Sequence, residues 1–256
     1  MAITLKRPKQ IDALREANRL VAEAFRELEQ AVRPGARLSD LDDMVTEFIE
    51  SRGAKPLYKG YRGSSGAQPP FPGTICASVN QEICHGLPDR RRLKNGDIIA
   101  IDIGLRLKGW CGDACVTYAV GDISAEAQRL LDVTRECLYI GIDAAQPGAR
   151  LTDIGAAIQE HAESHGYSVV REWGGHGVGR SLHEEPSVPH VGPGGRGPRL
   201  RPGMVFTIEP MINAGAADTR MLKDGWTVVT ADGSLSAQYE HTIALTEDGP
   251  LILSQL

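Results

Sequence analysis

A chain of 256 residues is long enough for one large domain or two small ones. A hydrophobic content of 41% and a charged content of 24% are ordinary for a globular protein, and a net charge of −5 argues against a protein that coats nucleic acid, because that role needs a basic surface. No apolar run approaches the roughly 20 residues of a membrane span, and the N-terminal MAITLKRPKQ has no apolar signal core. We therefore expect a cytoplasmic protein that neither crosses a membrane nor acts on nucleic acid.

The N-terminal part of the sequence predicts two helices and a loop. Over residues 8–32, apolar side chains recur at helical spacing with charged residues between them, which indicates an amphipathic helix. Ser39 is placed to cap a second helix over residues 40–52, and Gly53 is placed to end it. Residues 59–73 are rich in glycine, proline and serine and predict a loop.

Strand signals begin after this loop. Apolar runs bounded by turn residues predict strands within residues 74–88 and a hairpin within residues 96–120. A helix is expected over residues 124–146, and another, capped by Thr152, to about residue 165. The last predicted elements are a Gly/Pro-rich loop over 191–203 and strands within 167–172, 204–212, 226–233 and 236–245.

The sequence also repeats itself. The segment PGARL begins at Pro34 and again at Pro147, and each copy continues through a helical stretch to a glycine, Gly53 or Gly166. The later strands correspond as well, since LKNGDIIAIDIG resembles LRPGMVFTIEP. A helix-linking turn that recurred by chance would not carry matching flanks. We therefore expect an α+β chain of two related halves, about 1–122 and 123–256, with a ligand site where they meet.

Four acidic residues lie in strongly apolar strands. Asp102 and Glu209 occupy corresponding places in the two halves, while Asp113 and Glu240 lie in neighbouring apolar segments. A charged carboxylate inside a sheet is costly unless it is paired or bound to a metal. If the hairpin turns at residues 107–108, Asp102 and Asp113 become direct cross-strand neighbours. That arrangement destabilises a sheet unless a cation lies between the carboxylates or they share a proton.

These acids allow a metal site or a metal-free arrangement. Four carboxylates are too much charge for one divalent ion, whereas two ions bridged by some of the acids balance it, and two-metal sites activate water for hydrolysis. One imidazole added to such oxygen ligands suits Mn, Fe, Co or Zn. A shared proton, or pairing with arginines from elsewhere in the chain, would need no metal.

Three of the seven histidines lie in settings typical of functional sites. His176 is flanked by glycines, which let the backbone approach a ligand closely. His183 follows in the same segment, and His85 lies at the end of a predicted strand. By contrast, His161 and His165 lie on a predicted helix, where we expect them to be surface residues.

Five blocks of sequence together identify a family. In order they are CHGLPD, IDIG with GWCGDACV, GGHGVGRSLHEEP, FTIEPM and SAQYEHTIAL, and they resemble the bacterial type I methionine aminopeptidases over nearly the whole chain. The resemblance implies the pita-bread fold, an α+β fold in which two related halves carry helices over a curved antiparallel sheet. It also implies that residues 1–256 form a single catalytic domain.

The resemblance assigns a ligand to each candidate position. It implies two divalent metal ions per chain, drawn from Co, Mn, Fe and Zn. Asp102 would hold one ion, and His176 and Glu209 would hold the other. Asp113 and Glu240 would bridge both ions.

The reaction implied by the resemblance is removal of the initiator methionine from nascent proteins whose second residue is small. A hydroxide bridging the two ions would attack the first peptide carbonyl, with Glu209 as the proton carrier. His183 would hydrogen-bond the carbonyl and steady the tetrahedral intermediate, and His85 would contact the substrate near the scissile amide. The implied lining of the methionine pocket is Tyr61, Phe71, Cys76 and Trp226.

Two departures from the family pattern concern the pocket. Leu182 stands where the family often has phenylalanine, and the loop of residues 59–73 is longer than the common form. Neither departure touches a ligand position. The absence of a long N-terminal extension, and of a large insertion between His183 and Glu209, favours type I over type II.

Two alternatives share the resemblance. Xaa-Pro aminopeptidases and prolidases have the same fold and metal set, but they usually carry an additional N-terminal domain, for which 256 residues leave no room. A non-catalytic pita-bread binding module would have lost metal ligands, whereas all five positions here hold the expected residue types. We expect a monomer that associates at most transiently with the ribosome, since the basic run at 196–201 offers only a local patch.

Overall fold

The structure, a computed structural model, describes residues 2–63 and 65–255. Its helices are α1 (Pro8–Ala31), α2 (Leu38–Ser51), α3 (Ala125–Ala144) and α4 (Leu151–Ser164). The strands of the first half are β1 (Lys55–Pro56), β2 (Ile75–Val79), β3 (Glu82–Cys84), β4 (Ile98–Leu107) and β5 (Trp110–Ala119). Those of the second half are β6 (Ser168–Val169), β7 (Gly175–Gly177), β8 (Glu184–Val188), β9 (Val205–Ile208), β10 (Met211–Asn213), β11 (Thr219–Met221), β12 (Val228–Thr230), β13 (Ser236–Gln238), β14 (Glu240–Thr246) and β15 (Gly249–Ile252).

A nine-stranded antiparallel sheet dominates the described residues. Its main path runs β1-β4-β5-β14-β9-β7-β8, with β2 paired to β4 and β15 paired to β14. The pairing of β5 with β14 joins the strands of the two halves. Three-stranded sheets, β13-β10-β6 and β11-β12-β3, accompany it.

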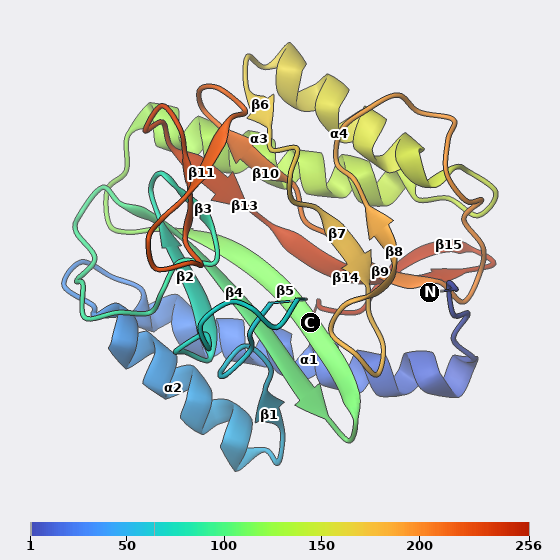
Figure 1. The fold of residues 1–256 in the computed structure, drawn as a ribbon, viewed down its shortest axis with the longest axis horizontal. Coiled ribbons are helices and arrows are strands. Elements are labelled where there is room, and N and C mark those ends of the chain that lie inside the picture. Colours follow the sequence, from blue (N-terminus) through green and yellow to red (C-terminus); the bar gives the residue numbers. More distant parts are fainter. Residues whose placement is uncertain (1, 64, 256) are drawn as a thin grey trace.

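Each half covers its strands with its own pair of helices (Figure 1). The apolar faces of α1 and α2 pack against β2, β4 and β5 in one core, which includes Leu28, Ile49 and Ile101. Those of α3 and α4 pack against β9 and β14 in a second core, which includes Ile158 and Phe206. The amphipathic periodicity of the helices thus accounts for the layered arrangement. Among the described residues, no helix combines the length and apolar character needed to span a bilayer.

Matching glycines support the internal repeat. Gly35 and Gly148, the glycines of the two PGARL segments, have φ of 88° and 90°. Gly53 and Gly166, which follow α2 and α4, have φ of 71° and 82°. Only glycine adopts these conformations at little cost, so the same turns recur at the same places in each half.

Both predicted helix caps are wrong by the same amount. The helices α2 and α4 begin two residues earlier than those caps predict, at Leu38 and Leu151, so Ser39 and Thr152 lie inside the first turn. The backbone N–H groups there donate to carbonyls of a neighbouring chain segment instead. Leu38 N–H donates to Arg91 O at 3.0 Å, and in the second half the equivalent Leu151 N–H donates to Pro198 O at 3.0 Å. Tertiary backbone acceptors replace side-chain caps in both halves.

The register predicted for the β4–β5 hairpin is also wrong. The turn lies at Lys108–Gly109, which have φ of 50° and 82°, as a tight two-residue hairpin turn requires. Asp102 therefore pairs with Cys115, and Asp113 pairs with Gly104. The two carboxylates remain on one face of the sheet as diagonal neighbours rather than direct partners.

Two predicted strands are interrupted at functional positions. The expected strand of residues 204–212 divides into β9 and β10 at Glu209–Pro210, because proline cannot donate to a strand ladder. The expected strand of residues 236–245 divides into β13 and β14 at Tyr239. Glu209 and Glu240 therefore lie at strand ends.

Candidate metal centre and substrate pocket

A cavity of about 310 Å³ lies between the two halves. It is lined by every candidate ligand and by every residue expected to contact substrate: Asp102, Asp113, His176, Glu209, Glu240, His85, His183, Tyr61, Phe71, Cys76 and Trp226. No lysine or arginine occurs among the described residues that line it. The alternative in which arginines neutralise the acids therefore has no support in the cavity.

The five candidate ligands come from five strand positions. Asp102 lies within β4, Asp113 within β5, His176 within β7, Glu209 directly after β9, and Glu240 at the start of β14. His176 Nε2 lies 3.5 Å from Asp113 Oδ2 and 3.7 Å from Glu209 Oε1. Ligand atoms of Asp113, His176 and Glu240 all lie within 4.8 Å of one another. The antiparallel sheet therefore gathers imidazole and carboxylate groups from both halves.

Hydrogen bonds orient His176 for ligation through Nε2. Its Nδ1 lies 3.1 Å from the carbonyl oxygen of Gly177, to which only a protonated Nδ1 can donate. Burial, followed by the neighbouring His183, lowers the pKa of His176 to about 3. The ring is therefore neutral near pH 7, with its Nε2 lone pair directed at the acids.

Burial also sets the protonation of the four acids. It is the largest cause that raises the pKa of Asp102 to about 7 and of Glu209 to about 8, against hydrogen bonds from Tyr58 and Thr207 respectively. Asp113 and Glu240, each 2% exposed, have their pKa raised well above the ordinary range by burial and by the neighbouring acids. Without a cation the cluster holds protons, and a divalent ion that binds there would displace them.

Glu209 is held at both carboxylate oxygens. Thr207 Oγ1 donates to Glu209 Oε1 at 2.7 Å, and Gln238 Nε2 donates to Oε2 at 3.3 Å. Thr207 Oγ1 also accepts the backbone N–H of His176 at 3.0 Å, so one hydroxyl fixes both side chains relative to each other. The backbone N–H of Glu209 donates to His190 Nε2 at 3.2 Å, which gives that buried histidine a positioning role.

His183 and His85 line the cavity beside the acids. The His183 ring lies 4.3 Å from that of His176, centroid to centroid, and its Nδ1 is 3.3 Å from the Tyr61 hydroxyl. His85 packs edge-on against Trp173, with centroids 4.9 Å apart. Burial lowers the pKa of His183, and burial together with His183 lowers that of His85 to about 4. Both rings are neutral hydrogen-bonding groups near pH 7.

An apolar pocket adjoins the acids. Phe71 meets Trp226 edge to face with centroids 5.3 Å apart, and Cys76 and Leu182 are buried in the same cluster. Its apolar and aromatic lining suits an apolar side chain. Leu182, the departure from the family pattern, thus fills part of the pocket wall.

The two ends of the long loop are held together beside this pocket. Backbone bonds of 2.9 Å from Gly60 N to Phe71 O, and of 2.8 Å from Phe71 N to Tyr61 O, hold its two ends together. The Trp226 indole donates to Pro69 O at 2.8 Å. Tyr61 and Phe71 are therefore held adjacent at the base of the loop, and Gly63 within it lines the cavity. Ser64, within this loop, lies outside the described residues.

Comparison with known proteins gives this site its context. The model of metallopeptidase family M24 matches residues 12–247. Methionine aminopeptidase 1 of Bacillus subtilis is 50% identical over 254 residues, which cover 99% of this chain and 100% of that protein. The chain belongs to metallopeptidase family M24.

Solved M24 structures confirm the fold. The crystal structure of methionine aminopeptidase from Rickettsia prowazekii matches with a TM-score of 0.95 at 45% identity, covering 99% of this chain and 100% of that one. The prolidase from Pyrococcus furiosus matches with a TM-score of 0.78 at 20% identity, covering 98% of this chain and 65% of that one. The pita-bread fold expected from the sequence is therefore confirmed, and the second match speaks for the fold alone.

The donor set fits the metal that an M24 metallopeptidase uses. One neutral imidazole and four carboxylates suit a hard or borderline divalent ion. Burial without lysine or arginine in the described cavity lining leaves the acids in need of a cation or of protons. Metal-binding residues of an M24 enzyme are thus available in this chain.

Sequence reasoning missed Tyr58. Its hydroxyl lies 2.5 Å from Asp102 Oδ1 and 2.7 Å from Asp113 Oδ1. Burial and then Asp102 raise the pKa of Tyr58 well above 10, so the phenol keeps its single proton. Gly104 makes room for the ring, because a Cβ there would lie 2.6 Å from Tyr58 Cε1. A tyrosine near prolines and glycines gave no sequence signal of this contact.

We expect Tyr58→Phe to weaken divalent metal binding by about tenfold, because partners of ligating carboxylates typically carry effects of this size. The ring, and hence its packing on Gly104, is retained. Calorimetric titration of the metal-free protein with Mn²⁺ measures the effect. Tyr239→Phe is the matched control, since that buried hydroxyl donates to Thr117 O at 2.9 Å, outside the acid cluster. Equal affinities in the two variants would contradict a role for Tyr58 at the metal centre.

Proposed function

We propose that this M24 metallopeptidase is a methionine aminopeptidase that removes the N-terminal methionine from proteins whose second residue is small. The observation that carries the proposal is the apolar pocket of Phe71, Cys76 and Trp226 directly beside the cluster of acids and His176. The relatives named methionine aminopeptidase, which match over nearly their whole length, support the same substrate.

We assign the metal ligands as the family resemblance implies. Asp102 would hold one ion, His176 and Glu209 would hold the other, and Asp113 and Glu240 would serve both. Two ions balance the charge of four carboxylates better than one, and such ions supply a water molecule of lowered pKa and polarise a carbonyl. Mn, Fe, Co and Zn all suit the donor set.

The protein's own groups bind and orient the substrate. The methionine side chain enters the pocket lined by Tyr61, Phe71, Cys76 and Trp226, which holds the first residue of the substrate beside the acids. His183 donates a hydrogen bond to the scissile carbonyl oxygen and stabilises negative charge as it develops there. His85 contacts the scissile amide on the side of Trp173. The Glu209 carboxylate accepts the proton of the attacking water and delivers it to the departing amine.

The assignment draws on both halves, so we take residues 1–256 as one catalytic domain. Substrates are the N-terminal methionine segments of nascent proteins. A cytoplasmic location, a monomeric state and transient contact with the ribosome stay predictions from the sequence.

The decisive experiment uses metal-stripped protein with Mn, Fe, Co or Zn added back singly. We expect metal-dependent release of methionine from Met-Ala-Ser and little release from a Met peptide with a bulky second residue, because a large second side chain would clash sterically with the cavity wall. Amino-acid release is measured beside an Ala-Pro peptide. Cleavage of the Ala-Pro peptide alone would assign the protein to the proline-specific M24 enzymes. A folded protein that cleaves none of the peptides with any metal would be a binding module.

A further inference from the structure

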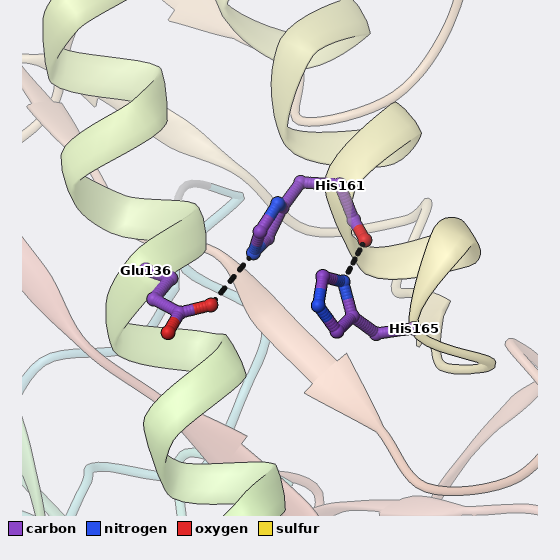
Figure 2. Close-up of side chains that lie close together, drawn as sticks. All are labelled: Glu136, His161 and His165. Atoms are coloured by element: carbon purple, nitrogen blue, oxygen red, sulfur yellow. Dashed lines mark hydrogen bonds and ion pairs between the residues drawn. The ribbon is translucent and has the colours of Figure 1, made fainter.

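A second group of metal-binding side chains lies between α3 and α4. Glu136 lies on α3, His161 lies in the last turn of α4, and His165 directly follows α4 as its C-cap residue, four residues after His161. Each offers a ligand atom, and these atoms all lie within 4.8 Å of one another (Figure 2). None of the three is among the described residues that line the catalytic cavity. The cluster is therefore separate from the site described above.

Hydrogen bonds orient both rings. His165 Nδ1 lies 2.9 Å from the carbonyl oxygen of His161, so it carries the ring proton and leaves the Nε2 lone pair free. Figure 2 shows this second nitrogen turned toward the side where Glu136 lies. His161 Nε2 lies 2.9 Å from Glu136 Oε2 and donates to it in the neutral ring. An ion that replaced this proton would leave the hydrogen of the His161 ring on Nδ1.

The surroundings suit a cation. The side chains of His161 and Glu136 are 22% and 54% exposed, so an ion can enter from solvent. The cluster lies at the C-terminal end of α4, where the partial negative charge of the helix favours positive charge. Arg129 is the opposing charge described nearby, and its Nη2 lies 3.4 Å from the carbonyl oxygen of His165. That contact involves the backbone carbonyl of His165 and leaves the Nε2 atom of its ring available to an ion.

We propose that Glu136, His161 and His165 form a second divalent-metal site that fastens α3 to α4. Two imidazoles and one carboxylate are the ligands that zinc accepts, with water completing a tetrahedral shell. This donor set contains more imidazole and less carboxylate than the catalytic centre. We therefore expect the ratio of zinc affinity to manganese affinity to be higher at the second site than at the catalytic centre. Because its ligands would come from α3 and from the end of α4, such an ion would stabilise the packing of these two helices.

The test compares the full-length protein with the double variant His161→Gln/His165→Gln. After equilibrium dialysis against Zn²⁺, we expect the unmodified protein to hold one more zinc ion per chain than the variant. His165→Gln alone should weaken that ion by about tenfold or more in calorimetric titration. Activity supported by Mn²⁺ should stay unchanged, since neither histidine lies in the catalytic cavity.

Two further variants keep the test decisive. Glu160→Gln, an exposed neighbour on α4, is the matched control and should bind zinc as the unmodified protein does. Glu136→Gln removes the one proposed ligand that α3 contributes. Its zinc content can be compared with that of the unmodified protein if the double variant fails to fold. Identical zinc content and affinity in the control, Glu136→Gln and His165→Gln would overturn the proposal and leave an ordinary ion pair between Glu136 and His161.

Discussion

Glu209→Gln is expected to lower kcat/KM for methionine release from Met-Ala-Ser by about three orders of magnitude, within the range for loss of a general acid–base group. Glutamine keeps the side-chain shape and one oxygen that can accept the hydrogen bond from Thr207. It removes the charge that attracts a divalent ion and the atom that accepts the proton. Steady-state kinetics at saturating Mn²⁺, with metal content measured on the same sample, check the prediction.

The control for this variant is Glu247→Gln, which alters an exposed glutamate in the turn between β14 and β15. It carries the same chemical change and should leave activity and metal content unaltered. A Glu209→Gln enzyme with full activity and full metal content would show that the ligand assignment is wrong. Full metal content with lost activity would instead separate proton transfer from metal binding and assign Glu209 chiefly to the former.

The candidate ligands could be proposed from sequence because each departs from a local pattern. Asp102 and Asp113 are acids in otherwise apolar strands, and burial of such groups requires a partner. His176 was identified from its flanking glycines, although the same glycines concealed that it lies on strand β7. Residues that break the local sequence pattern therefore indicated the candidate site. The pattern did not predict the strand on which His176 lies.

Pairing between strands distant in the sequence, and the register of the hairpin, could not be predicted from these local patterns. Tyr58 reaches the acids because β1 pairs with β4, with Pro56 opposite Leu105, and a two-residue strand has almost no sequence signature. The hairpin register depended on Lys108, a non-glycine residue with φ of 50°, which turn propensities do not favour. The register error made the acids direct rather than diagonal neighbours without changing the face on which they lie.

The helix starts failed for a similar reason. Serine and threonine are good caps in isolation, but Ser39 and Thr152 compete with backbone carbonyls that the fold brings alongside. An isolated β-bridge between Arg37 and Arg92 brings these carbonyls alongside α2, and the equivalent bridge between Arg150 and Arg199 does so for α4. The duplication thus reproduced a tertiary contact in both halves. A single sequence shows the repeat of PGARL but not the bridge that the repeat forms.

Glu184→Ala is expected to destabilise the protein by about 3 kcal/mol at pH 7, because it leaves a buried charge without its partner. Lys6, whose side chain is 5% exposed, donates to Glu184 Oε2 at 2.5 Å. The other oxygen accepts the backbone N–H groups of Arg180 and Ser181 at 2.8 and 3.1 Å. Glu184 thus ties the N-terminal segment to the loop that carries His183, and the variant should lose activity as well as stability.

The comparison that isolates the buried charge is with Glu16→Ala, which breaks an exposed pair with Lys108 and should cost less than about 1 kcal/mol. In the double variant Lys6→Met/Glu184→Ala the buried ammonium is gone, so the loss should be smaller than the sum of the single losses. Urea unfolding of the metal-free proteins measures each value. Equal losses for Glu184→Ala and Glu16→Ala would contradict a buried ion pair.

The stability lost in Glu184→Ala should depend on pH. The direction of that dependence shows which protonation state of Glu184 stabilises the fold. Burial raises the pKa of Glu184, but the hydrogen bond from Lys6 and the N–H groups of Ser181 and Arg180 outweigh it and leave the pKa lowered. A carboxylate whose pKa is lower in the folded state stabilises the fold above its ordinary pKa and loses that contribution as the pH falls. The deficit should therefore be full at pH 7 and shrink below about pH 4.5, where the unfolded chain takes up the proton first. A deficit that grew on acidification would mean that Glu184 is protonated in the folded protein and that Lys6 is neutralised by another group.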